Sequence, residues 1–359
     1  MVQLVFVHGV ATRSGPAYAV ETANRDRLFR DVLFAGSQVE IRSPLWGDIV
    51  PPGDERVFAG ANGVGTFGSN ARSPQALAAL TAGSMVSAFA QENGAAVTDG
   101  IYAAMIEQAD AAERPLDDND VALFKAAADS WGSAALPATD LDDALVMHLE
   151  QDAPASYSLG GRMKAAVGAI ADRLRNGVSG LVFNAVRDEL SPAIAKFLGD
   201  VFVYLKQDES RSRIQATIRQ ALLDAKAAGG PLVVIGHSLG GVILTDMLFD
   251  PAAAGLPSDF RIDALITVGS QPGLFDALGL FDFPHPAAGP APGPACVGTW
   301  FNVFDPIDPL AFRADPRFLD AQDLVFDSVT GLASAHTTYF KRPQFYARTR
   351  ARLHALGLI

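Results

Sequence analysis

The most informative segment for the fold is Pro231-Leu-Val-Val-Ile-Gly-His-Ser-Leu-Gly-Gly-Val-Ile-Leu244. It begins with an apolar run that is typical of a strand buried on both faces of a parallel sheet. It ends with an apolar segment that begins a helix. Glycines lie two residues before and two residues after Ser238, where small residues are needed if a side chain is to project from a sharp turn between a strand and a helix. The stretch therefore predicts a strand–turn–helix unit with Ser238 at the turn.

Other apolar runs of strand length flank this unit. The chain begins with one at Val2–Val7, and a shorter one follows at Val39–Arg42, with a helical pattern over Tyr18–Phe34 between them. Three more runs follow Ser238, namely Ile262–Val268, Thr299–Phe304 and Asp323–Val329. Because the runs are separated by helical or loop segments, we expect the α/β class, with a doubly wound, mostly parallel sheet.

Residues 52–200 have a different character. They are rich in alanine, interrupted by glycine, and contain no convincing strand. Helical patterns occur near Gln75–Ala90, Tyr102–Ala112 and Asp140–Glu150, and apolar residues three and four apart predict two long amphipathic helices, Met163–Leu174 and Leu190–Leu205. We interpret the segment as a helical insertion or lid within a single domain spanning residues 1–359.

Composition limits the partners of the chain. The formal net charge is −12 and the isoelectric point is about 4.9, so no broad positive field exists to attract nucleic acid or an anionic membrane surface. No run of 18 apolar residues occurs, which argues against a transmembrane segment. Met1–Val7 lacks the features of a signal peptide, and the single cysteine, Cys296, cannot close an intramolecular disulfide. We expect a cytoplasmic protein of undetermined oligomeric state.

Neither a cofactor nor a metal is indicated. The segment Gly63-Val-Gly-Thr-Phe-Gly68 has the spacing of a dinucleotide-binding loop, but no buried strand precedes it and no clear helix follows. No cluster of His, Cys, Asp or Glu has the spacing of metal ligands.

A serine hydroxyl becomes a good nucleophile only when a histidine accepts its proton and a carboxylate orients that histidine. Asp305 and Asp308 follow one predicted strand, and His336 follows the next. Both places lie at carboxyl ends of strands, where open α/β sheets carry their sites. We favour Asp308, because it lies further along the loop that must reach His336. Asp305 directly ends the strand and is the alternative. The carboxylate that is not used is expected to accept backbone N–H groups in the turn.

An oxyanion hole would need two backbone donors near Ser238. Leu239 N–H is the expected first donor, because it begins the helix after the turn. Val10 N–H is the expected second, after Gly9 allows a close backbone approach. His8 is expected to hold its loop by hydrogen bonds to the backbone, and His237 to be packed in the core.

With these residues in place, the chain resembles the α/β-hydrolase superfamily, in its lipase/esterase-like branch. The pieces that carry the resemblance are Val5–Gly9, Gly236–Gly241, Asp305–Leu310 and Ala335–Tyr339. It covers roughly residues 1–50 and 200–359. It implies a Ser238–His336–Asp308 triad, and an Asp followed by proline supports Asp308 as the acid.

The resemblance implies hydrolysis of a carboxylic ester, with a small-molecule ester or a lipid as substrate. The 22 phenylalanines favour an acyl chain. Two alternatives stay open. The same triad would serve a thioesterase or an acyltransferase, and a non-catalytic protein-binding module could use the same scaffold.

Overall fold

The computed structural model describes residues 1–10, 12–50, 99–100, 102–132, 199–283, 286, 289–326 and 335–359. The helices expected at Gln75–Ala90, Asp140–Glu150 and Met163–Leu174 lie outside the described residues, as does most of Leu190–Leu205. Of the expected helix Tyr102–Ala112, residues 102–111 are helical.

Six parallel strands form one sheet, in the order β2-β1-β3-β4-β5-β6. Their bounds are β1 Val2–Val7, β2 Val39–Arg42, β3 Leu232–His237, β4 Ile262–Val268, β5 Val297–Phe304 and β6 Ala321–Val325. The predicted α/β class with a parallel sheet is confirmed. The last strand begins two residues earlier than predicted, because its ladder to β5 runs from the pair Trp300–Ala321 to the pair Phe304–Val325.

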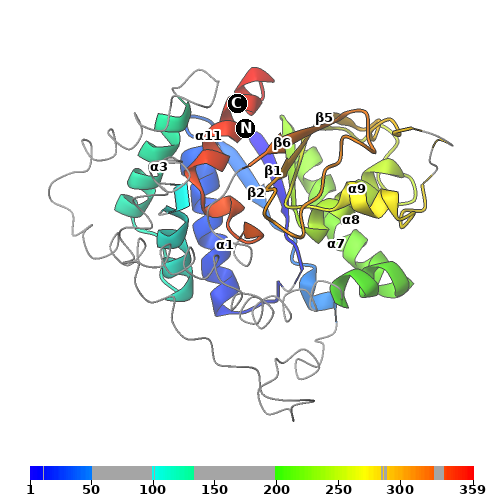
Figure 1. Cartoon of the computed structure of the whole chain (residues 1–359), viewed down its shortest axis with the longest axis horizontal. Helices are drawn as coiled ribbons and strands as arrows, with labels where there is room; N and C mark the ends of the chain where they lie inside the picture. The colour runs from blue at the N-terminus through cyan, green and yellow to red at the C-terminus, as the bar shows by residue number, and fades with distance from the viewer. Residues whose placement is uncertain are drawn as a thin grey trace, which may run out of the picture.

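Helices cover both faces of the sheet (Figure 1). One face carries α1 Pro16–Leu28, the π-helical turn η1 Phe29–Leu33, α3 Asp118–Gly132 and α11 Pro343–Ala355. The other face carries α7 Asp208–Ala228, α8 Leu239–Phe249 and α9 Pro272–Ala277. Within the described ranges, no helix has the length and apolar character needed to cross a bilayer.

Side chains of the central strands alternate between two hydrophobic cores. Leu4 and Phe6 of β1 pack into the core beneath α1 and α11, whereas Val5 and Val7 pack into the core beneath α7 and α8. Each of these four side chains is at most 3 % exposed. Successive side chains point to opposite faces of a strand, so a continuous apolar run is what a strand covered on both sides requires.

The chain changes direction across the sheet at β1. From β1 it moves to β2 on one side, and it later returns to β3 on the other side. In open α/β sheets such a reversal opens a crevice at the carboxyl ends of the two diverging strands, where ligands bind. Here Gly9 follows β1 and Ser238 follows β3 at this edge of the sheet.

Residues 102–132, part of the segment interpreted as an insertion, pack against the body of the domain. The ring of Phe124 meets that of Tyr346 at 5.2 Å between centroids. Asn24 of α1 donates to Asp110 at 2.9 Å and accepts the backbone N–H of Leu116 at 2.8 Å. Helix α3 was not predicted from the sequence, and it belongs to the core under α11.

The junction of α8 with β1 depends on Gly240. A Cβ at this position would lie 2.4 Å from the carbonyl oxygen of Val7, and this oxygen belongs to the backbone, which cannot turn aside. We expect Gly240→Ala to lower the free energy of unfolding by about 2 kcal/mol, measured by urea denaturation. Gly15→Ala is the matched control, because nothing lies within 4 Å of a Cβ there. Equal stability of the two variants would contradict this packing.

Candidate active site

Ser238 lies in a strained turn between β3 and α8. Its backbone has φ 52° and ψ −129°, a left-handed conformation that is costly for a residue with a side chain. The turn is held from both sides, because Ser238 N–H donates to Val268 O at 3.0 Å and Ser270 Oγ–H donates to Ser238 O at 2.7 Å. The predicted strand–turn–helix unit is therefore present, with Ser238 at its turn.

Two glycines leave room for this turn. A Cβ on Gly236 would lie 2.7 Å from Gly241 Cα, and a Cβ on Gly9 would lie 2.7 Å from Ser238 Cβ. Real Cβ atoms do not come this close, so both positions require glycine. The loop after β1 therefore packs against the turn after β3.

Ser238, His336 and Asp308 form a continuous hydrogen-bonded chain. His336 Nε2 lies 2.8 Å from Ser238 Oγ, and His336 Nδ1 lies 2.9 Å from Asp308 Oδ2. A carboxylate only accepts hydrogen bonds, so Nδ1 carries the proton and Nε2 is free to accept one from Ser238. The side chain of Asp308 is fully buried and that of His336 is 13 % exposed. This is the arrangement in which a histidine can activate a serine.

The structure brings Asp308, rather than Asp305, to the histidine. Asp305 Oδ1 accepts the backbone N–H of Ile307 at 3.0 Å, which is the turn role expected for the carboxylate not used. Asp308 Oδ1 accepts the backbone N–H of Leu310 at 2.9 Å, which leaves Oδ2 directed at His336.

The two histidines near the turn have structural contacts. His8 Nδ1–H donates to Gly9 O at 2.7 Å, and His8 Nε2 accepts Trp46 N–H at 3.1 Å, so the expected backbone hydrogen bonding of His8 is confirmed. His237 Nε2–H donates to His336 O at 2.9 Å. The side chain of His237 is partly exposed and borders a cavity, so it does not lie wholly in the core as expected. Burial lowers the pKa of His8 to about 4 and that of His237 to about 3. Both rings are therefore neutral at neutral pH.

The two expected oxyanion donors lie beside Ser238. Leu239 is the first residue of α8 and is fully buried, and the first N–H groups of a helix have no partner within the helix. Val10 follows Gly9, the residue that touches Ser238. The backbone of both residues therefore borders the place where a carbonyl bonded to Ser238 Oγ would lie.

Sequence reasoning assigned no role to Tyr339 or Ser270. Tyr339 is 1 % exposed, and its O–H donates to Asp308 Oδ2 at 2.9 Å. Its position three residues after His336 was the available signal. Ser270 supports the turn through the carbonyl of Ser238. It follows β4, a strand that carries no predicted site residue, so nothing in the sequence indicated it.

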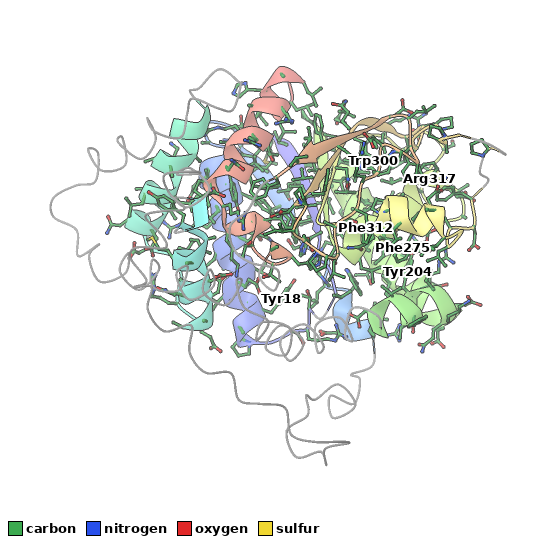
Figure 2. The ribbon with its side chains drawn as sticks, viewed as in Figure 1. Tyr18, Tyr204, Phe275, Trp300, Phe312 and Arg317 are labelled. Carbon is green, nitrogen blue, oxygen red and sulfur yellow. The ribbon has the colours of Figure 1, made fainter. Side chains whose placement is uncertain are left out.

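A cavity of about 420 Å³ opens next to the triad, between α1 and the 3-10 helix η4 Tyr339–Lys341. Gly9, His237 and Thr337, which are neighbours of Ser238 or His336, line this cavity together with Val10, whereas Ser238 and His336 do not line it. Tyr18, labelled in Figure 2, comes from α1 and lines the same cavity.

The walls of this cavity combine apolar and charged groups. Phe6, Leu28, Ile106 and Phe340 are its large apolar side chains, and Arg13, Arg25, Lys341, Glu21 and Asp110 are its charged ones. The guanidinium of Arg25 lies 3.8 Å from the centroid of the Phe6 ring, and Lys341 Nζ lies 3.0 Å from Asp110.

Across the part of the chain that the structure describes, no group of three or more His, Cys, Asp or Glu side chains could hold a metal ion. Comparison of the chain with protein-family models, with curated proteins and with solved structures finds no match.

The burial of His8 predicts a pH-dependent stability. The unfolded chain takes up a proton near pH 6.5, whereas the folded state resists protonation of His8 until about pH 4. Stability is therefore fully present above pH 6.5 and is lost as the pH falls through this window, by about 3 kcal/mol for this ring. We expect His8→Gln to flatten the decline in unfolding free energy between pH 6.5 and 4, measured by urea denaturation.

His354→Gln is the control for this experiment, because His354 is exposed at the end of α11. This variant removes an exposed imidazole and keeps His8. Its unfolding free energy should therefore decline between pH 6.5 and 4 as steeply as that of the unsubstituted protein. A decline in His8→Gln as steep as in the control would refute the assignment.

Proposed function

We propose that this protein is a serine hydrolase of the α/β-hydrolase type that cleaves a carboxylic ester through an acyl-enzyme. The observation that carries the proposal is the chain of contacts from Ser238 Oγ to His336 at 2.8 Å and from His336 to Asp308 at 2.9 Å. The order Ser, Asp, His along the chain, with the serine on a strand–turn–helix, is that of the α/β-hydrolase fold and supports the assignment.

The reaction follows from the geometry. Ser238 Oγ attacks the ester carbonyl while His336 Nε2 takes its proton, and the carbonyl oxygen becomes an oxyanion facing Leu239 N–H and Val10 N–H. Collapse of this intermediate breaks the ester C–O bond, and His336 returns the proton to the leaving alcohol. Water, deprotonated by His336, then attacks the acyl-enzyme and releases the acid. Asp308 stabilises the imidazolium in both steps.

The environment of Asp308 suits this role. Its carboxylate is buried, yet three donors surround it, namely Leu310 N–H, His336 Nδ1–H and Tyr339 O–H, at 2.9 Å each. Burial of a charged group is tolerated when hydrogen bonds replace its water. These three hydrogen bonds replace the water that the carboxylate loses, and in a dry site its attraction for an imidazolium is stronger than in water.

The nucleophile is tested by covalent labelling. A fluorophosphonate should form a single adduct on Ser238, and Ser238→Ala should abolish the adduct and lower kcat for an activated ester by roughly 10⁶-fold. The measurements are mass spectrometry of the labelled peptide and steady-state kinetics. Ser258→Ala, which changes an exposed serine, is the control. It should form the adduct on Ser238 and hydrolyse the activated ester with an unchanged kcat.

The same experiment separates the alternatives. A non-catalytic binding module predicts no adduct at Ser238. A thioesterase predicts the adduct together with faster turnover of a thioester than of the matching oxygen ester. An acyltransferase predicts that an added alcohol competes with water for the acyl group.

The cavity beside the triad supports a short, polar ester rather than a long acyl chain. Arg13, Arg25 and Lys341 line this cavity and are ion-paired with Asp200, Asp26 and Asp110, respectively. An alkyl chain beside them would displace the water bound by their remaining N–H groups without replacing its hydrogen bonds. Among the described phenylalanines, Phe6 and Phe340 are largely covered by core packing, and others, such as Phe275 (Figure 2), are buried in the opposite core, so these rings offer little surface to a lipid.

A chain-length series tests this substrate class. With p-nitrophenyl esters we expect kcat/KM to be highest for two- to four-carbon acyl groups and to fall at least about tenfold by eight carbons, a loss of about 1.4 kcal/mol in transition-state binding. Ala17→Phe, which narrows the cavity from α1, should weaken turnover further for the longer esters. Ala19→Phe, exposed on the same helix, is the matched control. A preference that rises with chain length would contradict the assignment while leaving Ser238 chemistry intact.

A further inference from the structure

Tyr339 connects the loop that carries His336 to the loop that carries Asp308. Its phenol oxygen has two hydrogen bonds, because it accepts the backbone N–H of Asp305 at 2.9 Å and donates to Asp308 Oδ2 at 2.9 Å. Asp305 is the residue after β5, and Tyr339 opens η4. One side chain therefore fixes both the start of the acid loop and the acid itself.

The fold reserves space for this ring. Gly269 follows β4 with φ +55°, and a Cβ there would lie 2.8 Å from Tyr339 Cε2 and 3.2 Å from Asp308 Oδ2. The ring of Phe326 packs on it at 5.6 Å between centroids. A side chain at position 269 would collide with the ring of Tyr339 and with the carboxylate of Asp308. Gly269 and Phe326 therefore confine the phenol to one position.

The oxygen that binds Tyr339 is the same one that binds His336. Asp308 Oδ2 accepts His336 Nδ1–H and Tyr339 O–H, while Oδ1 accepts Leu310 N–H. The carboxylate therefore cannot rotate without breaking a bond at each oxygen. Desolvation, reinforced by the charge of Asp308, raises the pKa of Tyr339 well above its usual value, so the phenol remains a donor across the working pH range.

We propose that Tyr339 is a positioning residue for the triad: its phenol holds Asp308 Oδ2 in line with His336 Nδ1 and moderates the charge that this oxygen presents. The inference rests on the proposed serine hydrolase function. Tyr339 does not line the cavity, which is bordered instead by its neighbours Phe340 and Lys341, so its effect reaches the substrate only through Asp308 and His336.

The test leaves the other ionisable groups around Tyr339 and Asp308 unsubstituted. His237 packs against His336 at 5.0 Å between ring centroids, and burial lowers its pKa to about 3, so it stays uncharged above that pH. Asp305 and Arg342 also act electrostatically on or near Tyr339. None of the three is changed in the variants below.

Tyr339→Phe keeps the ring and removes the hydroxyl. We expect kcat to fall roughly tenfold, which corresponds to loss of one hydrogen bond to a charged group, while KM stays unchanged. Without the phenol, Oδ2 carries more charge and favours the imidazolium, so the acid limb of the kcat/KM profile should move up by about 0.5 pH unit.

Tyr346→Phe is the matched control. Tyr346 is also fully buried, and its O–H donates to the backbone carbonyl of Phe340 at 2.7 Å and not to Asp308. It should lose stability to a similar extent, with kcat and the acid limb unchanged. A Tyr339→Phe protein with unaltered kcat and acid limb, or one whose loss of activity is matched by Tyr346→Phe, would overturn the proposal.

A second readout needs no turnover. The His336 Nδ1 proton, observed by NMR of protein labelled with ¹⁵N-histidine, should shift or broaden in Tyr339→Phe and stay in place in Tyr346→Phe. If no ester is cleaved and Ser238 forms no adduct, the proposed function fails, and this resonance still decides whether Tyr339 holds Asp308. An unchanged resonance in Tyr339→Phe would refute the inference whatever the activity.

Discussion

The strained turn at Ser238 is the constraint on which the arrangement of the site depends. A non-glycine residue with φ 52° costs of order 1–3 kcal/mol and persists only where its surroundings determine it. Here the buried strand β3 and the buried helix α8 fix both ends, and hydrogen bonds to β4 and to Ser270 fix the middle. The strain places Oγ at the edge of the sheet, toward His336, instead of in the core.

A parallel sheet then brings distant parts of the chain to that edge. The loops after β3, β5 and β6 all leave the sheet at its carboxyl end, so Ser238, Asp308 and His336 meet although they are up to 98 residues apart. Loop-to-loop contacts set the final distances. His237 holds the carbonyl of His336, and Tyr339 holds the start of the loop after β5.

The sequence indicated those features that depend on local pattern. A continuous apolar run is visible wherever a strand is buried on both faces, and the Gly-x-Ser-x-Gly turn requires its glycines at fixed spacing. Asp308 could be favoured over Asp305 because only the later residue reaches across the loop.

Features that depend on tertiary contact were not visible. Helix α3 lies in a segment where no predicted strand marks its ends. It packs on the rest of the domain through the contact of Phe124 with Tyr346. The start of β6 is set by pairing with β5 rather than by its own residues, which include Gln322 and Asp323. Side chains of α1 and η4, which are far apart in sequence, line the same cavity. The spacing of Tyr339 from His336 is visible in the sequence, but the contact of its hydroxyl with Asp308 Oδ2 is a tertiary one that the spacing does not reveal.

The distribution of charge explains why a phenol is suited to position 339. In the acyl transfer that we propose, Asp308 would stabilise the imidazolium of His336, and the strength of that attraction depends on the negative charge of the carboxylate. A lysine in place of Tyr339 would orient Oδ2 but would also neutralise it. A phenylalanine would leave the charge but release the orientation. A buried tyrosine donates one hydrogen bond and adds no charge, and the neutral state of His237 keeps a second cation away from His336.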